Sequence, residues 1–587
     1  MNVNRRKLLS LIGMSPALLS GTPAIAKDRK SAELAPTGSG TLEALNPRGT
    51  PPAIKLIPLA PRLESLDGKT VYLVDTGFMG GAALLQQMQI WFTKNMPTTK
   101  AVYRKKAGPY PEDDPVLWKE IKANGNAAIM AIGHCSGCTP ATISHCITVE
   151  KMGIPTVPVV TRAYRDLATV NAAKKGMPLI RTSFTPHPVW GKTPDELWAY
   201  IEGPDPITGK PLMKEIIGGL TNPVTPEEEK TGEISVSIGA PTFKGTPREL
   251  QEYYLNNGMT DYLPIILPTQ ELVDEMLTGT SHKPDEVVGK MAAGFFAPWT
   301  YTVRDVAVNA VMAGARPEYL PVILAIASSG MASLSSSTNS FATAAVINGP
   351  IRDKLQMNYG IGAMGPFAQS NAAIGRVWTL LSKNVGNGGI PGDSYGGSQG
   401  NNLNYNNLII AENEQDSPWV PLHVQFGHKP EENVVTVFEG LGIASGEGGT
   451  GGGALVNPLY DRQIASVFGV FINLFGALVV MDPLVAKRLV EQGYDTKEKL
   501  IGYLYENSTH TVKEYKETTH VYTFEYPRAL RGEEPYATWY KSPDDAHIPR
   551  WPKPSAITLV VAGGQANAFF QAGNMSARGS ISIDKWA

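Results

Sequence analysis

Residues 127–161, AAIMAIGHCSGCTPATISHCITVEKMGIPTVPVVT, contain the pattern that decides the fold of the first half of the chain. The apolar run Ala127–Gly133 predicts a buried strand, the apolar spacing over Ile143–Met152 predicts a helix, and Thr156–Thr161 predicts a second strand. A strand, a helix and a strand in this order are typical of a parallel sheet. We therefore expect an α/β domain here.

A second unit of the same kind precedes this stretch. Lys69–Asp75 predicts a strand, Thr76–Gly81 a glycine-rich turn and Ala82–Asn95 a helix, so we expect a doubly wound parallel sheet with helices on both faces. Ligands of such sheets bind beyond the carboxyl ends of the strands, so the turn and His134–Cys138 are predicted to line one crevice. The turn lacks the spacing of a dinucleotide fingerprint. A simple tight turn and an anion site at the next helix both stay open, and the candidate substrate-binding residues are Asp75, Gly80 and Gly81.

Cys135 and Cys138 form a Cys-x-x-Cys pair at the junction of the predicted strand and helix. The free N–H groups and the positive dipole end of a helix stabilise a thiolate, so we expect Cys135 to attack a substrate and Cys138 to resolve the adduct as a disulfide. His134 would assist proton transfer. Two alternatives stay open: an inert buried pair, and a metal site completed by His134, His145 and Cys146. Taken alone, Cys146 is interpreted as a core residue.

The composition limits the possible functions. The chain has 587 residues, with 52 basic against 54 acidic side chains and three cysteines. The length predicts at least two domains, and the balanced charge argues against nucleic acid as a partner. The cysteines all lie between positions 135 and 146, which is not the spread of a disulfide framework. We assign residues 61–245 to the Cys-x-x-Cys domain and 246–587 to a larger α/β or α+β domain.

The N-terminus has the features of an export signal, which we assign to residues 1–26. Arg5–Lys7 is basic, Leu8–Ser20 is a short apolar run, and Ala24–Ala26 fits a cleavage site. The match to a twin-arginine signal is loose, so either export route stays open, and a retained anchor is the alternative. We expect a periplasmic location and a flexible lead over residues 27–60.

The second domain carries polar residues beside predicted elements. Residues 411–423, AENEQDSPWVPLH, could supply a general base or hard-metal ligands, or could be a solvated acidic turn. Arginine and asparagine within apolar helical patterns could bind a substrate carboxylate or form a buried network. The candidate substrate-binding residues of this domain are Arg352, Asn371, Arg376, Glu412 and His423.

Two glycine-rich loops and one long apolar run complete the second domain. Residues 384–407 and 446–453 are predicted to be loops that close over the crevice. Residues 464–481 carry no charge but contain Asn473 and Gly476, so a buried core helix is favoured over a membrane span. We expect no stable membrane insertion.

Gly133–Thr161 resembles the UGSC family of (seleno)proteins, whose members carry selenocysteine-Gly-Ser-Cys, or cysteine in place of the selenocysteine, at this corner. By this resemblance, Cys135 matches the selenocysteine and Cys138 matches the family's cysteine. The chain departs from the family in its middle pair, Ser136-Gly137, and in having His134 where an aspartate is expected. Selenium at the matching position implies that Cys135 is a nucleophile or redox centre. A further similar stretch is Ala60–Asp75. The stretches that resemble the family's associated second module are Asp305–Pro321, Asn348–Arg352, Asn371–Arg376 and Ala411–His423.

Together, these features predict an exported thiol-dependent enzyme that cleaves a carbon–heteroatom bond of a small molecule by reduction or desulfurisation. Its redox group would be the disulfide of Cys135 and Cys138, restored by a thiol electron donor, and a metal is left open. We expect a homo-oligomer. The alternatives are a metal-assisted hydrolase or lyase with Cys and His ligands, and a periplasmic small-molecule-binding or thiol-relay protein without turnover.

Overall fold

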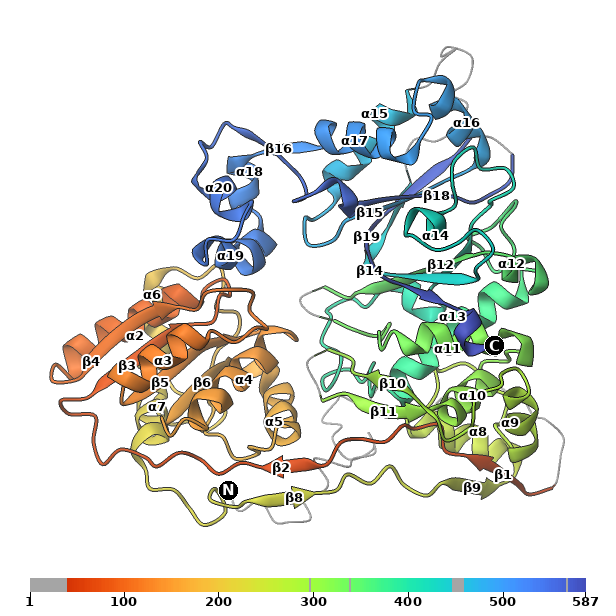
Figure 1. Ribbon diagram of the computed structural model, residues 1–587. Helices are drawn as coiled ribbons and strands as arrows, with labels where there is room; N and C mark the ends of the chain where they lie inside the picture. Colours follow the sequence, from red (N-terminus) through yellow and green to blue (C-terminus); the bar gives the residue numbers. More distant parts are fainter. Residues whose placement is uncertain (1–39, 295–296, 337–338, 446–458, 566–567) are drawn as a thin grey trace, which may run out of the picture.

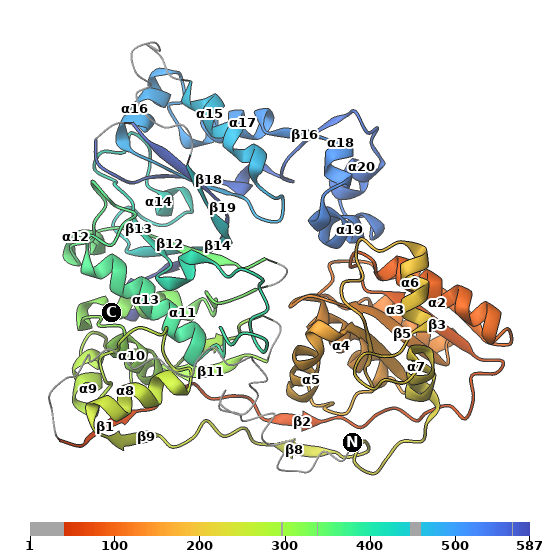
Figure 2. The same cartoon turned by 180° about the vertical axis from the view of Figure 1, so that it is seen from behind.

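The computed structural model describes residues 40–294, 297–336, 339–445, 459–565 and 568–587. The described residues form an N-terminal lobe, a C-terminal lobe beside it and a smaller unit that extends from the C-terminal lobe over the N-terminal one (Figures 1 and 2). The expected export signal, the first part of the expected lead and the glycine-rich loop at 446–453 lie outside the described residues.

A parallel sheet forms the centre of the N-terminal lobe. In the described part of the chain it has five strands, all paired in parallel, in the order β4-β3-β5-β6-β7. From β3 the chain adds β4 on one side and then β5, β6 and β7 on the other side. The switch point of the doubly wound fold therefore lies between β3 and β5. The strands are β3 (Thr70–Asp75), β4 (Lys100–Lys105), β5 (Ala127–Gly133), β6 (Thr156–Thr161) and β7 (Ser183–Thr185).

Helices cover both faces of this sheet, as the alternating pattern predicts. On one face Leu73 packs in a core with Leu84 and Met88, and on the other Val74 packs in a core with Trp118 and Ile147. The first face is covered by α2 (Gly81–Asn95), α6 (Pro194–Glu202) and α7 (Leu212–Thr221). The second is covered by α3 (Pro115–Asn124), α4 (Cys138–Glu150) and α5 (Arg165–Lys174). The doubly wound α/β prediction is confirmed.

Residues 40–60 are not the flexible lead that the sequence predicts. β1 (Leu42–Leu45) pairs with β9 (Thr242–Gly245), and β2 (Ile54–Leu56) pairs with β8 (Gly232–Ile234), both antiparallel. These ribbons run below the two lobes and connect them (Figure 1). The strands are ordered because their backbone groups are paired with strands about 175 to 205 residues further along the chain, a contact that local composition does not reveal.

The C-terminal lobe contains a mixed sheet. Among the described residues it has six strands in the order β13-β12-β14-β19-β15-β18, with parallel pairs at both edges and antiparallel pairings between them. This order is two copies of one arrangement, β12-β13-β14 and β15-β18-β19, which meet where β14 pairs with β19. The strands are β12 (Ala342–Asn348), β13 (Leu408–Ala411), β14 (Val434–Ser445), β15 (Ala477–Met481), β18 (Ile557–Val561) and β19 (Phe570–Ser582).

This sheet curls around a core of its own. One cluster of buried side chains includes members of every strand of the sheet, among them Ala344, Phe438, Val480 and Val560. The carboxyl ends of the two edge strands also meet, because the N–H of Asn413, after β13, donates to the Val561 carbonyl of β18 at 2.7 Å. The outer surface is covered by α10 (Val303–Met312), α11 (Leu320–Ser328), α13 (Gln369–Asn384), α15 (Tyr460–Val467), α16 (Pro483–Glu491) and α17 (Lys497–Asn507).

Residues 464–481 do not form the single core helix that the sequence predicts. Helix α15 ends at Val467, a short turn of 3-10 helix follows over Phe468–Val470, and Ala477–Met481 is strand β15. The N–H of Gly476 donates to the Ser576 hydroxyl of β19, so this residue is bonded to the sheet rather than along a helix. Among the described residues, no helix combines the length and the apolar character that a membrane crossing requires.

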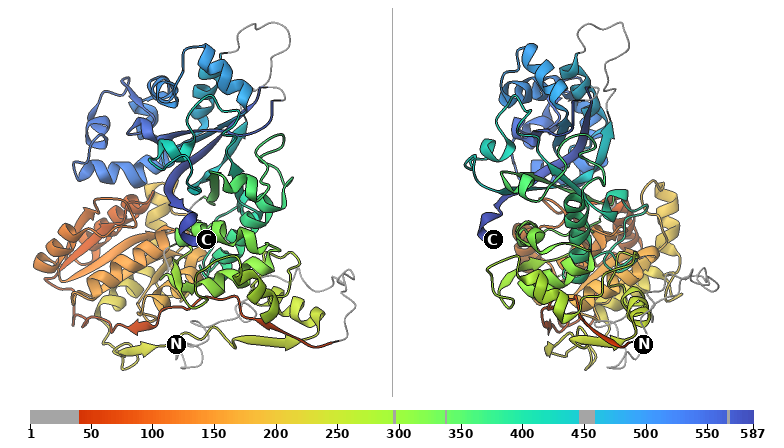
Figure 3. Two further views of the ribbon diagram at one scale, coloured as in Figure 1. Left: turned by 45° about the vertical axis from the view of Figure 1, so that its right-hand side comes forward. Right: turned by 90° about the vertical axis from the view of Figure 1, so that its right-hand side faces the viewer.

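The smaller unit, residues 509–549, is named the cap unit here. The antiparallel pair β16 (Thr509–Thr511) and β17 (His547–Pro549) joins it to the C-terminal lobe, and it has a small core around Tyr515 and Trp539. Figure 3 shows it lying over the N-terminal lobe. Its helices are α18 (Val512–Lys516), a π-helix (Val521–Glu525), α19 (Tyr526–Leu530) and α20 (Tyr536–Lys541).

The remaining α-helices and strands lie outside the cap unit. They are α8 (Pro247–Asn256), α9 (Gln270–Leu277), β10 (Val287–Met291), β11 (Trp299–Thr302), α12 (Ile351–Lys354) and α14 (Leu422–Gln425).

Candidate active site

A cavity of about 620 Å³ lies where the two lobes and the cap unit meet, and Cys135 is in its wall. The C-terminal lobe contributes Asn339, Phe341, Gly396, Ser398, Ile472 and Leu474. The cap unit contributes Thr518, Thr519, His520, Thr523 and Phe524. All three units therefore contribute to its wall.

The N-terminal lobe contributes residues that follow the carboxyl ends of its strands. Phe78 and Met79 follow β3, Tyr110 follows β4, His134 and Cys135 follow β5, Tyr164 follows β6, and His187 and Trp190 follow β7. This is the edge at which doubly wound sheets bind their ligands. The loops after β3 and β5 thus reach the same cavity, although through Phe78 and Met79 instead of Asp75, Gly80 or Gly81.

Cys135 and Cys138 form a disulfide, with their Cα atoms 5.3 Å apart. Cys138 is the first residue of helix α4, and its N–H donates to the Sγ of Cys135 at 3.0 Å. The N–H of His134 donates to the Sγ of Cys138 at 3.2 Å. Cys135 is 5% exposed and lines the cavity, whereas Cys138 is fully buried behind it. In the reduced pair, Cys135 would be the sulfur that a bound molecule meets first.

Gly133 explains why the chain can turn so sharply from strand to helix. The register of β5 against β6 shifts between Ala131 and Gly133, and such irregularities redirect the following residues. A Cβ on Gly133 would lie 2.9 Å from a methyl group of Val160 and 3.1 Å from the Cα of Thr139. The first turn of α4 can therefore pack against the end of the strand only because residue 133 has no side chain.

His134, His187 and His520 face the cavity from two of its units. Burial lowers the pKa of His134 to about 4, with His187 adding to the effect, and burial likewise lowers the pKa of His520 to about 4. The Nδ1 of His134 and the Nε2 of His520 are buried and have no hydrogen-bond partner among the described residues. At neutral pH both rings are therefore uncharged.

His187 and His520 are site residues that the sequence analysis missed. His187 stands 3.1 Å, by its Nδ1, from the hydroxyl of Thr161, the last residue of β6. Because ligands bind beyond the carboxyl ends of parallel strands, the position of His187 after β7 could have indicated a site residue. His520 belongs to the cap unit, and nothing in its surrounding sequence indicates that this segment returns to the N-terminal lobe.

The glycine-rich loop at 384–407 packs on the Cys-x-x-Cys turn. A Cβ on Gly396 would lie only 2.4 Å from the Cβ of Ser136, so the two chains touch at this point. The Nζ of Lys174, in α5, also pairs with Asp393 of the loop at 3.0 Å. This loop therefore closes one side of the cavity, next to the cysteine pair.

The cap unit is held to the N-terminal lobe by aromatic and charged contacts. Its Phe524 ring lies 5.0 Å from the ring of Tyr110, edge to face. The Nζ of Lys105 lies 3.7 Å from the centre of the Tyr522 ring, within cation–π range. Arg531 pairs with Glu112 at 2.7 Å. The cap unit thus lies over the loop that follows β4 and covers the cavity.

Asp75, Gly80 and Gly81 build the turn before α2 instead of lining the cavity. The carboxylate of Asp75 accepts the N–H of Gly77 at 2.9 Å and the hydroxyl of Tyr103 at 3.1 Å, and burial raises its pKa. Gly80 has a φ of 84°, which favours glycine, and caps the helix. The Cβ position of Gly81 lies 3.2 Å from the Asp75 carboxylate. The tight-turn interpretation accounts for all three residues.

Glu412 and Arg352 belong to a buried network in the C-terminal lobe, away from the cavity wall. The Glu412 carboxylate accepts hydrogen bonds from Lys497 at 3.0 Å, from Asn348 at 2.6 Å and from the N–H of Leu422 at 2.7 Å. Arg352 pairs with Glu414 at 3.0 Å and donates to the Glu412 carbonyl. These contacts hold together the carboxyl ends of β12 and β13.

Asn371, Arg376 and His423 also have protein partners and do not line the cavity. Asn371 donates to the Ile409 carbonyl at 3.1 Å, and Arg376 forms a two-point pair with Asp261 at 2.8 and 3.0 Å. His423 is buried, with its Nε2 3.3 Å from the Pro430 carbonyl. The structure therefore gives the five candidates of the second domain structural contacts and does not bring them to Cys135.

The metal alternative does not fit the geometry around the cysteines. Of its proposed ligands, His145 has both ring nitrogens occupied, by Asp113 at 3.2 Å and the Tyr110 carbonyl at 2.8 Å. Cys146 is buried in the core, where burial raises the pKa of its thiol. The described residues contain no group of three or more His, Cys, Asp or Glu side chains arranged to hold a metal ion.

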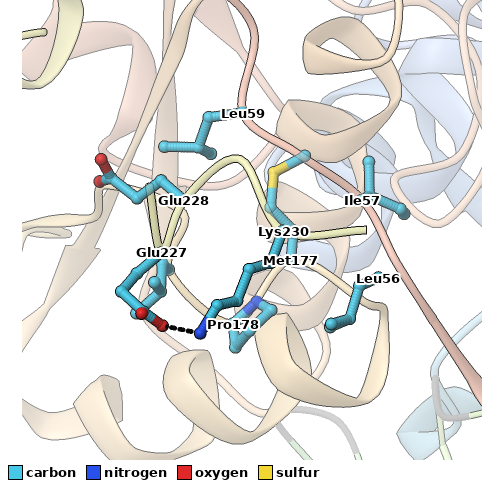
Figure 4. A pocket seen from close by; sticks show the side chains of 9 residues that line it. Leu56, Ile57, Leu59, Met177, Pro178, Glu227, Glu228 and Lys230 are labelled. Carbon is cyan, nitrogen blue, oxygen red and sulfur yellow. Dashed lines mark hydrogen bonds and ion pairs between the residues drawn. The ribbon is translucent and has the colours of Figure 1, made fainter. Parts of the chain in front are cut away.

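A second hollow lies on the N-terminal lobe near the β2–β8 ribbon (Figure 4). Leu56, Leu59 and Met177 line it, and the Lys230–Glu227 ion pair lies at its edge. Its volume is about 40 Å³, which is close to the space of one water molecule. It has no cysteine and no room for a metabolite. The cavity at Cys135 has both, and it is the candidate active site.

Comparison with protein families gives a match over the N-terminal lobe. Residues 43–203 match the model of the UGSC family. The match includes the whole parallel sheet, the Cys-x-x-Cys pair and the cavity residues of the N-terminal lobe. The resemblance inferred from the sequence is confirmed for this part of the chain. Comparisons with curated proteins and with solved structures give no match.

Proposed function

We propose that the protein is a thiol-dependent enzyme acting on a small molecule through Cys135, because Cys135 lines the cavity within a segment that matches the UGSC family. One observation carries the proposal: Cys135 lines the cavity, and its Sγ accepts the N–H of the first residue of α4. A helix N-terminus favours the thiolate over the thiol, and the thiolate is the nucleophile. Cys138 lies directly behind it to complete the reaction.

The reaction that suits this pair is the reductive cleavage of a bond between carbon and a heteroatom group X. The Cys135 thiolate attacks X and forms an S–X bond, while the electron pair of the C–X bond leaves with carbon, which takes up a proton. Cys138 then attacks the sulfur of Cys135, the disulfide forms, and X leaves with its electron pair and a proton. In sum, R–X and two thiols give R–H, H–X and one disulfide. A low-molecular-weight or protein dithiol must then reduce the disulfide.

His134 supports both steps from the cavity wall. Its neutral ring has one N–H and one lone pair, so it can relay a thiol proton to the carbon by taking up one proton as it releases the other. Its backbone N–H donates to the Sγ of Cys138 at 3.2 Å, which helps to hold the second sulfur in place behind the first.

The proposals of export, periplasmic location and a homo-oligomer rest on the sequence alone.

Thiol mapping tests this function. The reduced protein is treated briefly with iodoacetamide, and the modified cysteines are identified by mass spectrometry. We expect Cys135 to react at least tenfold faster than a cysteine in an unstructured peptide, and Cys146 to stay unmodified because it is fully buried. Cys146→Ser, the matched control, should leave the rate at Cys135 unchanged.

Turnover is then separated from binding. The reduced protein is incubated with fractionated metabolites, and free thiols are counted before and after. An enzyme of the proposed kind loses two thiols per molecule cleaved, and Cys138→Ser accumulates an adduct on Cys135. The proposal fails if Cys135 reacts no faster than the peptide, or if ligands bind without any loss of thiols, as in a binding protein.

A further inference from the structure

The wall of the cavity carries no permanent charge. Among the described residues that line it there is no lysine, arginine, aspartate or glutamate. Nearby charged groups are engaged elsewhere: Lys105 with the Tyr522 ring and Glu112 with Arg531. An anionic ligand would lose its hydration here without meeting an opposite charge, which is unfavourable. The cavity therefore disfavours carboxylates and phosphates.

Aromatic side chains from all three units surround the same space. Such side chains pack well against flat apolar groups, and pockets that bind small molecules are mostly lined in this way. The volume of about 620 Å³ is within the range of such pockets. The aromatic members of the wall are Phe78, Tyr110, Tyr164, Trp190, Phe341 and Phe524.

Two histidine rings belong to this wall from two different units. His134 is part of the N-terminal lobe and His520 of the cap unit, and each residue is only 8% exposed. A neutral imidazole ring offers one hydrogen-bond donor and one acceptor. One ligand placed between the two units could therefore hydrogen-bond to both rings.

We propose that the cavity binds an uncharged, ring-containing molecule with two hydrogen-bonding groups, one directed to His134 beside Cys135 and one to His520 in the cap unit. The proposal adds a ligand class to the proposed function. It rests on that function only where it identifies this ligand as the substrate. It assigns His520 a substrate-binding role and gives the cap unit a part in recognition.

The test uses two probes that share a ring and differ in charge, 2-naphthamide and 2-naphthoate. Their binding to the full-length protein is measured by titration calorimetry at pH 7.5. We expect the amide to bind at least tenfold more tightly than the carboxylate. Replacing the cavity histidine in His520→Phe, which keeps a ring but removes the nitrogens, should weaken amide binding about threefold to tenfold.

Two variants that each add one positive charge extend the test. Leu474→Lys places a cation in the wall and should shift the preference at least tenfold toward 2-naphthoate. Val116→Lys introduces the same charge at a residue that is 79% exposed and outside the wall, and should change nothing. Equal or tighter binding of the carboxylate to the wild type, or no binding of either probe, would overturn the proposal.

The outcome is independent of sulfur chemistry. In Cys135→Ser, preference for the amide should persist, because the wall and both histidines are intact. If the amide is preferred but Cys135 shows no enhanced reactivity, the ligand class stands and the proposed function fails. If Cys135 is reactive but the carboxylate is preferred, the function stands and the ligand class is wrong.

Discussion

At the scale of single residues, the predicted site residues differ in whether they line the cavity. The charged groups of Glu412 and Arg376 are bonded by the protein itself, to Lys497 and Asp261 among others, and neither residue lines the cavity. His134, by contrast, lines it beside Cys135. A polar group bonded within the protein stabilises the fold, whereas a polar side chain in a cavity wall is available to a ligand. Position in the wall therefore separates the C-terminal network from the candidate active site more clearly than residue type does.

The ion pair of Glu412 and Lys497 provides a test at this scale. Both side chains have no exposed surface, so Lys497→Met leaves an unpaired buried carboxylate. We expect the free energy of unfolding to fall by about 3–5 kcal/mol, measured by urea denaturation. The folded variant should still bind 2-naphthamide normally, because Glu412 is outside the cavity wall.

Lys499→Met is the matched control for this prediction. Lys499 lies in the same helix but pairs with Asp495 at the surface, where an ion pair contributes about 0–1 kcal/mol. If Lys497→Met were as mild as the control, or if it abolished binding of the probe in folded protein, then a structural role for Glu412 would be contradicted.

At the scale of elements, the important contact is the one between two loops from different lobes. Gly396 has no room for a Cβ, which would lie 2.4 Å from the Cβ of Ser136. We expect Gly396→Ala to destabilise the protein by about 1–3 kcal/mol and to alter the rate at which iodoacetamide modifies Cys135. Thermal unfolding and thiol mapping measure the two effects.

A double substitution separates this contact from general damage. Ser136→Gly removes the side chain that the new methyl group would meet, so the double variant Ser136→Gly/Gly396→Ala should recover part of the loss. Gly579→Ala is the control, since nothing lies within 4 Å of the Cβ position there. Additive losses in the double variant would show that the two loops do not press on each other.

The same elements show what the sequence could and could not predict. Continuous apolar runs predict the strands that end at Asp75 and Gly133. The tendency of ligands to bind beyond the carboxyl ends of parallel strands indicated the right loops. Within those loops polar residues drew attention, but Phe78 and Met79 line the cavity while Asp75 supports the turn. Sequence periodicity also misjudged residues 464–481, because an uncharged apolar run suits a buried strand as well as a buried helix.

Contacts between distant parts of the chain lay beyond sequence reasoning altogether. β1 is ordered by β9, and His520 reaches the cavity only because the cap unit packs on the loop after β4. Neither contact has a local signal, since both depend on how complete lobes are arranged. The prediction that Arg352 and Glu412 bind a substrate was wrong for a related reason. Charged groups that could bind a ligand can equally form hydrogen bonds that hold two strand ends together.

At the scale of the whole molecule, the cavity exists because the cap unit lies on the N-terminal lobe. Arg531 of the cap unit pairs with Glu112 and also donates to the carbonyls of Ala107 and Asp113, at 3.2 and 3.1 Å. The Gly108 N–H donates to the Pro527 carbonyl beside it. The cap unit is joined to its own lobe through the narrow β16–β17 pair, so these contacts decide how firmly the cavity is closed.

Loosening this closure should expose Cys135. Arg531→Ala removes one ion pair and two hydrogen bonds to the N-terminal lobe, worth about 1–2 kcal/mol together at a partly exposed site. We expect pyrenylmaleimide, a bulky thiol reagent, to modify the reduced variant about threefold to tenfold faster at Cys135. Hydrogen exchange should also become faster in residues 512–541 and 105–113. Arg248→Ala, which removes an exposed pair with Glu252 far along the chain, is the control. Unchanged rates in Arg531→Ala, or an equal rise in Arg248→Ala, would mean that the cap unit does not control access to the sulfur.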